Sequence, residues 1–134
     1  MRYIFISRDK LECKLKEILL DNEKIYGCYI FGSYGTEDFT EESDIDIAII
    51  TDIDLRNLYR LQDRLEEELD INIDLLNIRE LPKYIQLQIT SRGDIVFCSS
   101  DEKFDEYLDE MHRWYEEEYP FWAKNMMLRG VEFD

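Results

Sequence analysis

Hydrophobic residues recur along this 134-residue chain with two spacings, and each spacing predicts a different kind of element. Where apolar positions return every three or four residues, as the leucines of residues 55–69 do, they predict an amphipathic helix. Helices are expected over residues 7–21, 54–69, 81–90 and 101–127, the last interrupted near Pro120. Ser7 suits the cap of the first helix, and Pro82 is well tolerated in the first turn of the third.

Four short runs of β-prone residues lie between these helices, at residues 25–31, 44–50, 71–77 and 94–98. The first run ends at Gly32, and the second alternates carboxylate and isoleucine before it becomes wholly apolar. Strands that alternate with helices predict one α/β (α+β) domain, in which helices are layered on a sheet.

The composition fits a folded domain with an acidic surface. Apolar residues make up 45% of the chain and aromatic residues 13%, which argues against disorder. Lys and Arg number 16 against 32 Asp and Glu, so the net charge is −16. A field of this sign repels phosphate backbones and argues against direct nucleic-acid binding. It is compatible with a basic partner protein, and with a nucleotide whose phosphates are offset by a metal ion.

The sequence gives no indication of export or of a membrane. No apolar stretch reaches the length of a membrane span, and the first residues lack the apolar core of a signal peptide, so a cytoplasmic location is expected. Cys13, Cys28 and Cys98 are dispersed and show no metal-ligand spacing. They are expected to be small buried residues in a reducing compartment.

The chemically most specific segment covers residues 30–50. A strand ends at Gly32 and Ser33, ten residues follow, and Asp44 and Asp46 then flank one isoleucine. Alternate residues of a strand point the same way, about 6.5 Å apart, so these two carboxylates can share a hard divalent cation. Asp74 lies between two apolar residues of the third strand, where a charge is costly without a partner; the alternative is an edge strand facing water. The pattern predicts Mg²⁺-dependent phosphoryl or nucleotidyl chemistry.

This arrangement of Gly-Ser, ten residues and Asp-x-Asp resembles the polymerase-beta-like nucleotidyltransferase superfamily, over residues 25–98. The small size is similar to the minimal nucleotidyltransferases of bacteria and archaea, the MntA-like antitoxin group. The resemblance implies a small mixed sheet flanked by helices. It implies a nucleotidyltransferase domain over residues 1–100, and residues 101–134 as a helical extension that packs on it or forms an interface.

The same resemblance implies roles for individual residues. Asp44 and Asp46 would bind Mg²⁺, and Asp74 would join them and help to activate the incoming hydroxyl. Gly32 would allow close approach of a nucleotide phosphate, and Ser33 would donate to it through its N–H and hydroxyl groups.

The function implied for such a chain is transfer of AMP from ATP to a hydroxyl of a partner protein. In the antitoxin group this partner is a HEPN-type ribonuclease toxin, modified on a tyrosine near its active site. One alternative is a catalytically weak module of the same fold that neutralises its partner by binding. Another is a small-molecule nucleotidyltransferase of the aminoglycoside-modifying kind. Because no second large domain is present to grip an acceptor, either the partner or a homodimer would complete the site.

Two features depart from the family pattern or lie outside it. The loop after Ser33 lacks the usual basic residue, places Glu37 at the usual glycine, and is acidic at Glu37, Asp38, Glu41 and Glu42. Like charges weaken triphosphate binding, so a cation from elsewhere, such as Lys24 or Arg92, would have to compensate.

Residues 104–127 are dense in aromatics and methionines, which suits an interface or packing on the domain itself.

Overall fold

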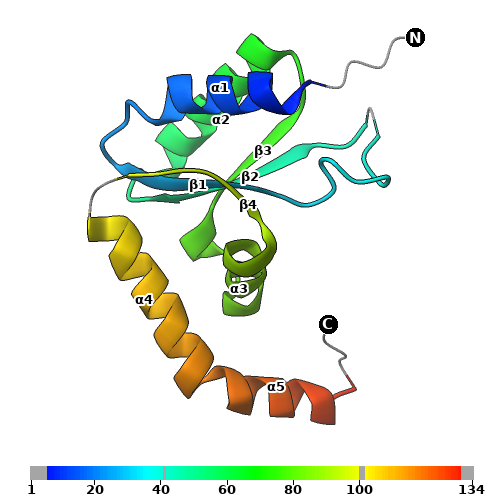
Figure 1. Ribbon diagram of the computed structural model, residues 1–134, viewed down its shortest axis with the longest axis vertical. Coiled ribbons are helices and arrows are strands. Elements are labelled where there is room, and N and C mark those ends of the chain that lie inside the picture. The colour runs from blue at the N-terminus through cyan, green and yellow to red at the C-terminus, as the bar shows by residue number, and fades with distance from the viewer. Residues whose placement is uncertain (1–5, 41, 100–101, 131–134) are drawn as a thin grey trace.

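The computed structural model describes residues 6–40, 42–99 and 102–130 and shows a central sheet with helices on both faces (Figure 1). The elements in chain order are α1 (Arg8–Leu19), β1 (Ile25–Phe31), β2 (Ile45–Thr51), α2 (Leu55–Leu69), β3 (Ile73–Asn77), the 3-10 turn η1 (Ile78–Glu80), α3 (Lys83–Arg92), β4 (Asp94–Cys98), α4 (Glu102–Glu117) and α5 (Tyr119–Leu128). Asp101, the expected start of the last helical segment, lies outside the described residues.

The sheet is mixed, with strand order β3-β2-β1-β4. β1 is antiparallel to both β2 and β4, whereas β2 and β3 are parallel and joined by the crossover helix α2. The predicted α/β class and small mixed sheet are therefore confirmed. The strand ends differ slightly from prediction, since β2 begins at Ile45 and β3 at Ile73.

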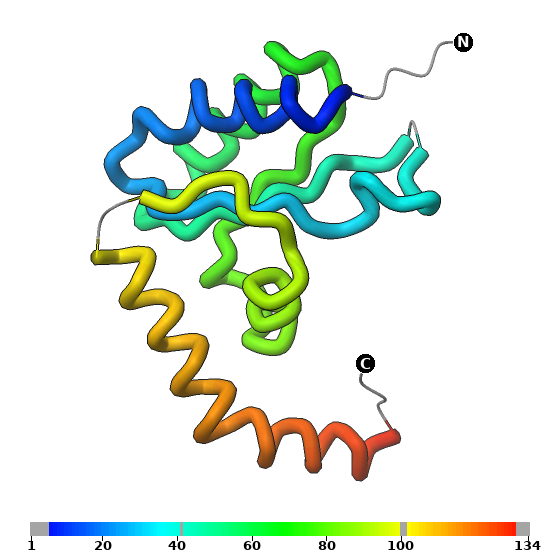
Figure 2. The backbone as a smooth tube through the Cα atoms, viewed as in Figure 1, coloured from blue at the N-terminus to red at the C-terminus, as the bar shows by residue number. Residues whose placement is uncertain are grey.

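Alternation along β2 divides the core into two parts. Ile45, Ile47 and Ile49 face one side and pack in a cluster with leucines of α1 and α2. Ala48 and Ile50 face the other side, in a cluster that includes Ile89 of α3 and Tyr107 of α4. In Figures 1 and 2, α1 and α2 accordingly lie above the sheet, and α3 and α4 below it. Asp46 is an even number of residues from Ala48 and Ile50, so its side chain points to the same face of the sheet as theirs, the face covered by α3.

The C-terminal helices differ in how firmly they are held. α4 buries Phe104, Tyr107 and Met111, and the Tyr107 hydroxyl donates to Gln86 Oε1 of α3 at 2.9 Å. α5 has no buried residue among those described and extends away from the sheet (Figure 2). It contacts α3 through Trp122, whose ring stacks on Tyr84 at a centroid distance of 4.8 Å. The expected interruption near Pro120 is confirmed, because α4 ends at Glu117 and α5 begins at Tyr119.

The expectation that all three cysteines are buried is wrong for two of them. Cys28 is buried in β1, and burial raises the pKa of its thiol. Cys13 is exposed on the outer side of α1, and Cys98 is exposed at the end of the edge strand β4. In the described part of the chain, every helix is too short or too polar to cross a membrane.

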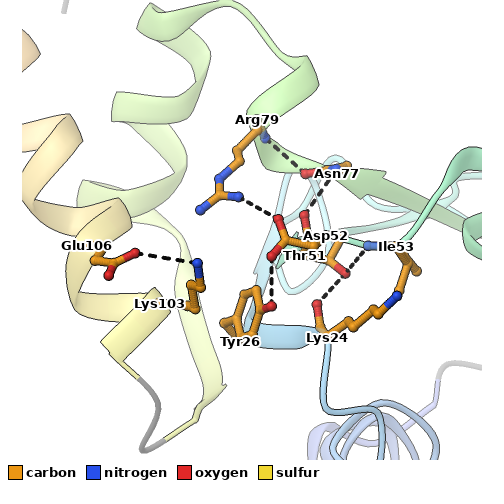
Figure 3. Close-up of polar contacts among 9 residues, drawn as sticks. All are labelled: Lys24, Tyr26, Thr51, Asp52, Ile53, Asn77, Arg79, Lys103 and Glu106. Carbon is orange, nitrogen blue, oxygen red and sulfur yellow. Dashed lines mark hydrogen bonds and ion pairs between the residues drawn. The ribbon is translucent and has the colours of Figure 1, made fainter.

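A polar network fastens the end of the sheet where β1 begins and β2 and β3 finish (Figure 3). Asp52 accepts from the Tyr26 hydroxyl at 2.7 Å and from Arg79 Nη1 at 3.0 Å. The Thr51 hydroxyl donates to the Lys24 carbonyl at 2.6 Å. This network leaves the opposite end of the sheet, where β1 runs into Gly32 and β2 begins, for the candidate site.

Candidate active site

Three carboxylates meet where β2 and β3 begin. Asp46 is the second residue of β2 and Asp74 the second of β3, and the two are direct partners in the parallel register. Partner residues on neighbouring strands point to the same face, so both carboxylates lie on the α3 side of the sheet. Asp44 lies two residues before Asp46, just outside the strand, and is exposed. The structure thus brings together the three acids that the sequence singles out.

The carboxylates repel one another. Burial raises the pKa of Asp46 above its ordinary value, and the charges of Asp74 and Asp44 raise it further. The pKa of Asp74 is raised by burial, then by the charges of Asp44 and Glu66. Asp74 is half-buried although β3 is an edge strand, so the alternative of an acid simply facing water does not describe it. A cation between these groups would relieve the repulsion.

The donor set suits Mg²⁺ in its chemistry. All three groups offer carboxylate oxygens, the hard ligands that this ion prefers, and their mutual repulsion favours a cation. In the geometry of the described residues, however, no group of three or more Asp, Glu, His or Cys side chains is placed to hold a metal ion. The acids are neighbours with suitable chemistry, and water or substrate oxygens would have to supply further ligands to an ion.

Gly32 lies against Asp46. Its φ is +78°, in the left-handed region that favours glycine, and a Cβ at this position would collide with Asp46 Oδ2. The backbone at Gly32 therefore reaches the carboxylate directly, and any side chain would displace it. Gly35 also has positive φ, +84°, but a Cβ there would meet no atom within 4 Å.

The loop after Gly32 is held by contacts with the start of α1. The Ser33 carbonyl accepts from Thr36 N–H at 2.9 Å and from the Thr36 hydroxyl at 2.6 Å, closing a turn. Tyr34 donates its hydroxyl to the Ile6 carbonyl at 2.8 Å. Its ring meets Phe39 edge-on at 5.4 Å.

The loop acids that the structure describes face solvent. Glu37, Asp38 and Glu42 are all exposed, and Glu41 lies outside the described residues. Their charges are therefore screened by water, which reduces their effect on a bound phosphate.

A cavity of about 680 Å³ opens beside Gly32, between the loop, the end of β1 and α3. Two arginines line it: Arg8 from α1 and Arg92 from the end of α3. Arg8 pairs with Asp94 at 3.0 Å and lies 5.8 Å from the Tyr34 ring centre. Of the two cations considered from sequence, Arg92 is thus at the site, whereas Lys24 lines a separate cavity with Asp52 and Arg60. Sequence reasoning missed Arg8, because its position depends on contacts between distant segments, of Tyr34 with Ile6 and of Arg8 with Asp94.

The site of this α/β domain thus combines a glycine turn, a row of acids on adjoining strands, and a cavity lined by two arginines. Residues 13–102 match the family described as polymerase beta, nucleotidyltransferase, and the chain belongs to that family.

Two kinds of relatives agree with this membership. The protein adenylyltransferase MntA of Shewanella oneidensis is 34% identical over 85 residues, which cover 61% of this chain and 61% of that protein. Two solved structures share the fold. A toxin-antitoxin structure with AMP-PNP has a TM-score of 0.62 at 24% identity, covering 86% of this chain and 98% of that one. A tri-AMPylated HEPN toxin of Shewanella oneidensis in complex with MNT antitoxin gives 0.61 at 23% identity, covering 90% and 99%. The chain spans about three fifths of the length of the first curated relatives it matches.

Proposed function

We propose that this chain is a Mg²⁺-dependent nucleotidyltransferase that transfers AMP from ATP to a hydroxyl of a partner protein, and acts as the antitoxin of a HEPN-type toxin. The observation that carries the proposal is the position of Asp46, which has the Gly32 backbone against its carboxylate and Asp74 as its partner on β3. This arrangement places a phosphate-accessible turn next to a row of acids. The names of the similar proteins supply the acceptor and the partner.

In this reaction Asp44, Asp46 and Asp74 would hold the ion. Bound Mg²⁺ would neutralise charge on the phosphate oxygens. Gly32 lets the phosphates approach the backbone, and Ser33 can donate its N–H and hydroxyl to them. Arg8 and Arg92 face the cavity that would receive the rest of the triphosphate.

The transfer itself forms a bond between the acceptor oxygen and the α-phosphorus, and breaks the bond from that phosphorus to the pyrophosphate oxygen. Asp74 would accept the proton that the acceptor hydroxyl loses.

The direct test uses ATP labelled at the α-phosphate, Mg²⁺ and a lysate of the native host. Wild type is compared with Asp44→Asn/Asp46→Asn, which should lower protein labelling by about 100-fold or more, since metal ions contribute several kcal/mol to such transition states. Asp38→Asn, which removes an exposed charge of the same loop, is the matched control and should leave labelling unchanged. Equal labelling by all three proteins would refute the assigned site.

A binding module without transfer is the second candidate, and α5 is the observation that favours it. Phe121, Met127 and Leu128 are 72%, 67% and 78% exposed, so a large apolar surface is available to a partner. If wild type labels no protein, yet a tagged copy retains a partner that Phe121→Ser releases, the binding module is correct and the enzyme proposal fails.

A further inference from the structure

A second cavity, of about 570 Å³, lies along the outer edge of β3, on the opposite side of Asp46 from β1 and Gly32. It is formed between α2, β3 and η1, and Asp74 is one of its lining residues. The apolar part of its lining consists chiefly of Leu55, Leu58, Tyr59, Leu76 and Leu81. We call this cavity the β3 groove. It begins at the carboxylate proposed to accept the proton from the acceptor hydroxyl.

The β3 groove exposes apolar side chains to water. Leu55 is 61% and Tyr59 55% exposed, whereas α2 buries Leu58, Leu65 and Leu69. These two side chains belong to adjacent turns of one helix, at positions i and i+4 on the same face. Their exposure is costly for an isolated domain and is typical of a surface that a partner covers.

The free edge of β3 is closed to an added strand. The Ile73 N–H donates to Glu66 Oε2 at 3.0 Å, and the Leu75 N–H donates to Gln62 Oε1 at 2.9 Å. Both acceptors come from α2, so these two outward amides of the strand are already satisfied. A partner is therefore bound here through side chains placed in the groove and not by extension of the sheet.

The charge of the β3 groove is opposite to that of the cavity beside Gly32. Asp54, Asp74 and Glu80 line the groove, and its described lining contains no Lys or Arg. The cavity beside Gly32 instead has Arg8 and Arg92 together with one acid, Asp94, which pairs with Arg8. The carboxylate row thus separates a cationic cavity, which suits a triphosphate, from an acidic, apolar groove, which suits a cationic segment of protein.

We propose that the β3 groove docks the acceptor segment of the partner: a stretch of chain with apolar side chains and flanking lysines or arginines. Its apolar side chains pack on Leu55 and Tyr59, its cations face Asp54 and Glu80, and its hydroxyl reaches Asp74. Leu55 and Tyr59 are then specificity-determining residues for the acceptor. The proposal rests on the proposed function for the role of Asp74, but the docking itself is measurable without transfer.

The test measures how tightly the protein binds a fluorescent peptide in which one tyrosine is flanked by leucines and then by lysines. Binding is monitored by fluorescence anisotropy, without ATP or Mg²⁺. Leu55→Ser/Tyr59→Ser should weaken binding by about tenfold, equivalent to roughly 1.4 kcal/mol. Leu20→Ser is the matched control, because Leu20 is 47% exposed at the end of α1, outside the groove, and should bind as wild type does. The same peptide with glutamates in place of lysines should bind at least about tenfold more weakly.

A second variant guards against a folding defect. Leu55→Lys keeps a long side chain at an exposed position and adds a cation to the groove, so it should also weaken the lysine peptide while its thermal unfolding matches wild type. Equal binding by wild type and all groove variants would overturn the proposal. So would a dimer in sedimentation that Tyr59→Ser dissociates, because the groove would then be covered by a second copy. If the binding pattern holds but wild type transfers no AMP in the lysate assay, the docking groove stands and the proposed function fails.

Discussion

One added methyl group at Gly32 tests whether the glycine turn and Asp46 act as a unit. In Gly32→Ala the new Cβ would be directed at Asp46 Oδ2, so the carboxylate or the turn must move. Gly35→Ala is a matched control: both glycines have positive φ, +78° and +84°, but the Cβ at Gly35 would meet nothing within 4 Å. The two variants therefore share the backbone strain and differ in the collision.

The expected magnitudes follow from this difference. Placing an L-residue in the left-handed region costs about 1–2 kcal/mol, so Gly35→Ala should lose about that much free energy of unfolding, and Gly32→Ala more because of its collision. Displacement of a catalytic group by about 1 Å can lower a rate by about 100-fold. We expect a loss of that size in AMP transfer for Gly32→Ala and a change of less than about threefold for Gly35→Ala.

Urea unfolding followed by circular dichroism gives the stabilities, and initial rates with labelled ATP give the activities of the same preparations. If the two variants lose equal activity at equal stability, the contact between Gly32 and Asp46 has no role in catalysis and the reasoning is wrong.

Three other predictions concern the site and its support. Asp46→Asn should abolish transfer yet stabilise the metal-free protein. Because the pKa of Asp46 is raised in the fold, wild type should lose stability relative to the variant as pH rises above the ordinary value of 3.8. Thermal melts from pH 3 to 7 would detect this loss. Arg92→Ala should raise the KM for ATP by about tenfold, roughly 1.4 kcal/mol, with little change in kcat, whereas Lys24→Ala should change neither in steady-state assays. Tyr107→Phe removes the hydroxyl that donates to the buried Gln86 and should cost about 1–2 kcal/mol in urea unfolding, with transfer unchanged.

Much of the fold follows from local pattern. The leucines of residues 55–69 fix α2, and the alternating acids and isoleucines after Asp44 fix β2, because burial on one or both sides imposes the helical and strand periods. The candidate acids were found by their spacing from Gly32 and Ser33, and Asp74 by its charge within an apolar strand. These signals lie within short stretches of chain, which is why sequence alone reveals them.

What the sequence could not give depends on contacts between distant segments. Arg8 lies at the cavity because the start of the chain's first helix contacts distant segments, through Ile6 with Tyr34 and through Arg8 with Asp94. The exposure of Cys98 depends on β4 being an edge strand, which no local pattern states. The β3 groove likewise requires α2 to lie along the free edge of β3, so that Leu55 and Tyr59 line the same cavity as Asp74.

Because Asp46 and Asp74 are partners in the register of β2 and β3, the strand pairing that folds the sheet also assembles the site. If β3 slipped by one residue against β2, its side chains would exchange faces, and Asp74 would enter the core under α2 while Ile73 and Leu75 left it. Burying an unpaired carboxylate and exposing two apolar side chains would cost several kcal/mol, so such a chain would unfold before it could bind a nucleotide wrongly. Cells would therefore remove misregistered copies as unfolded protein, and insertions in the α2 crossover can persist only where they preserve this register.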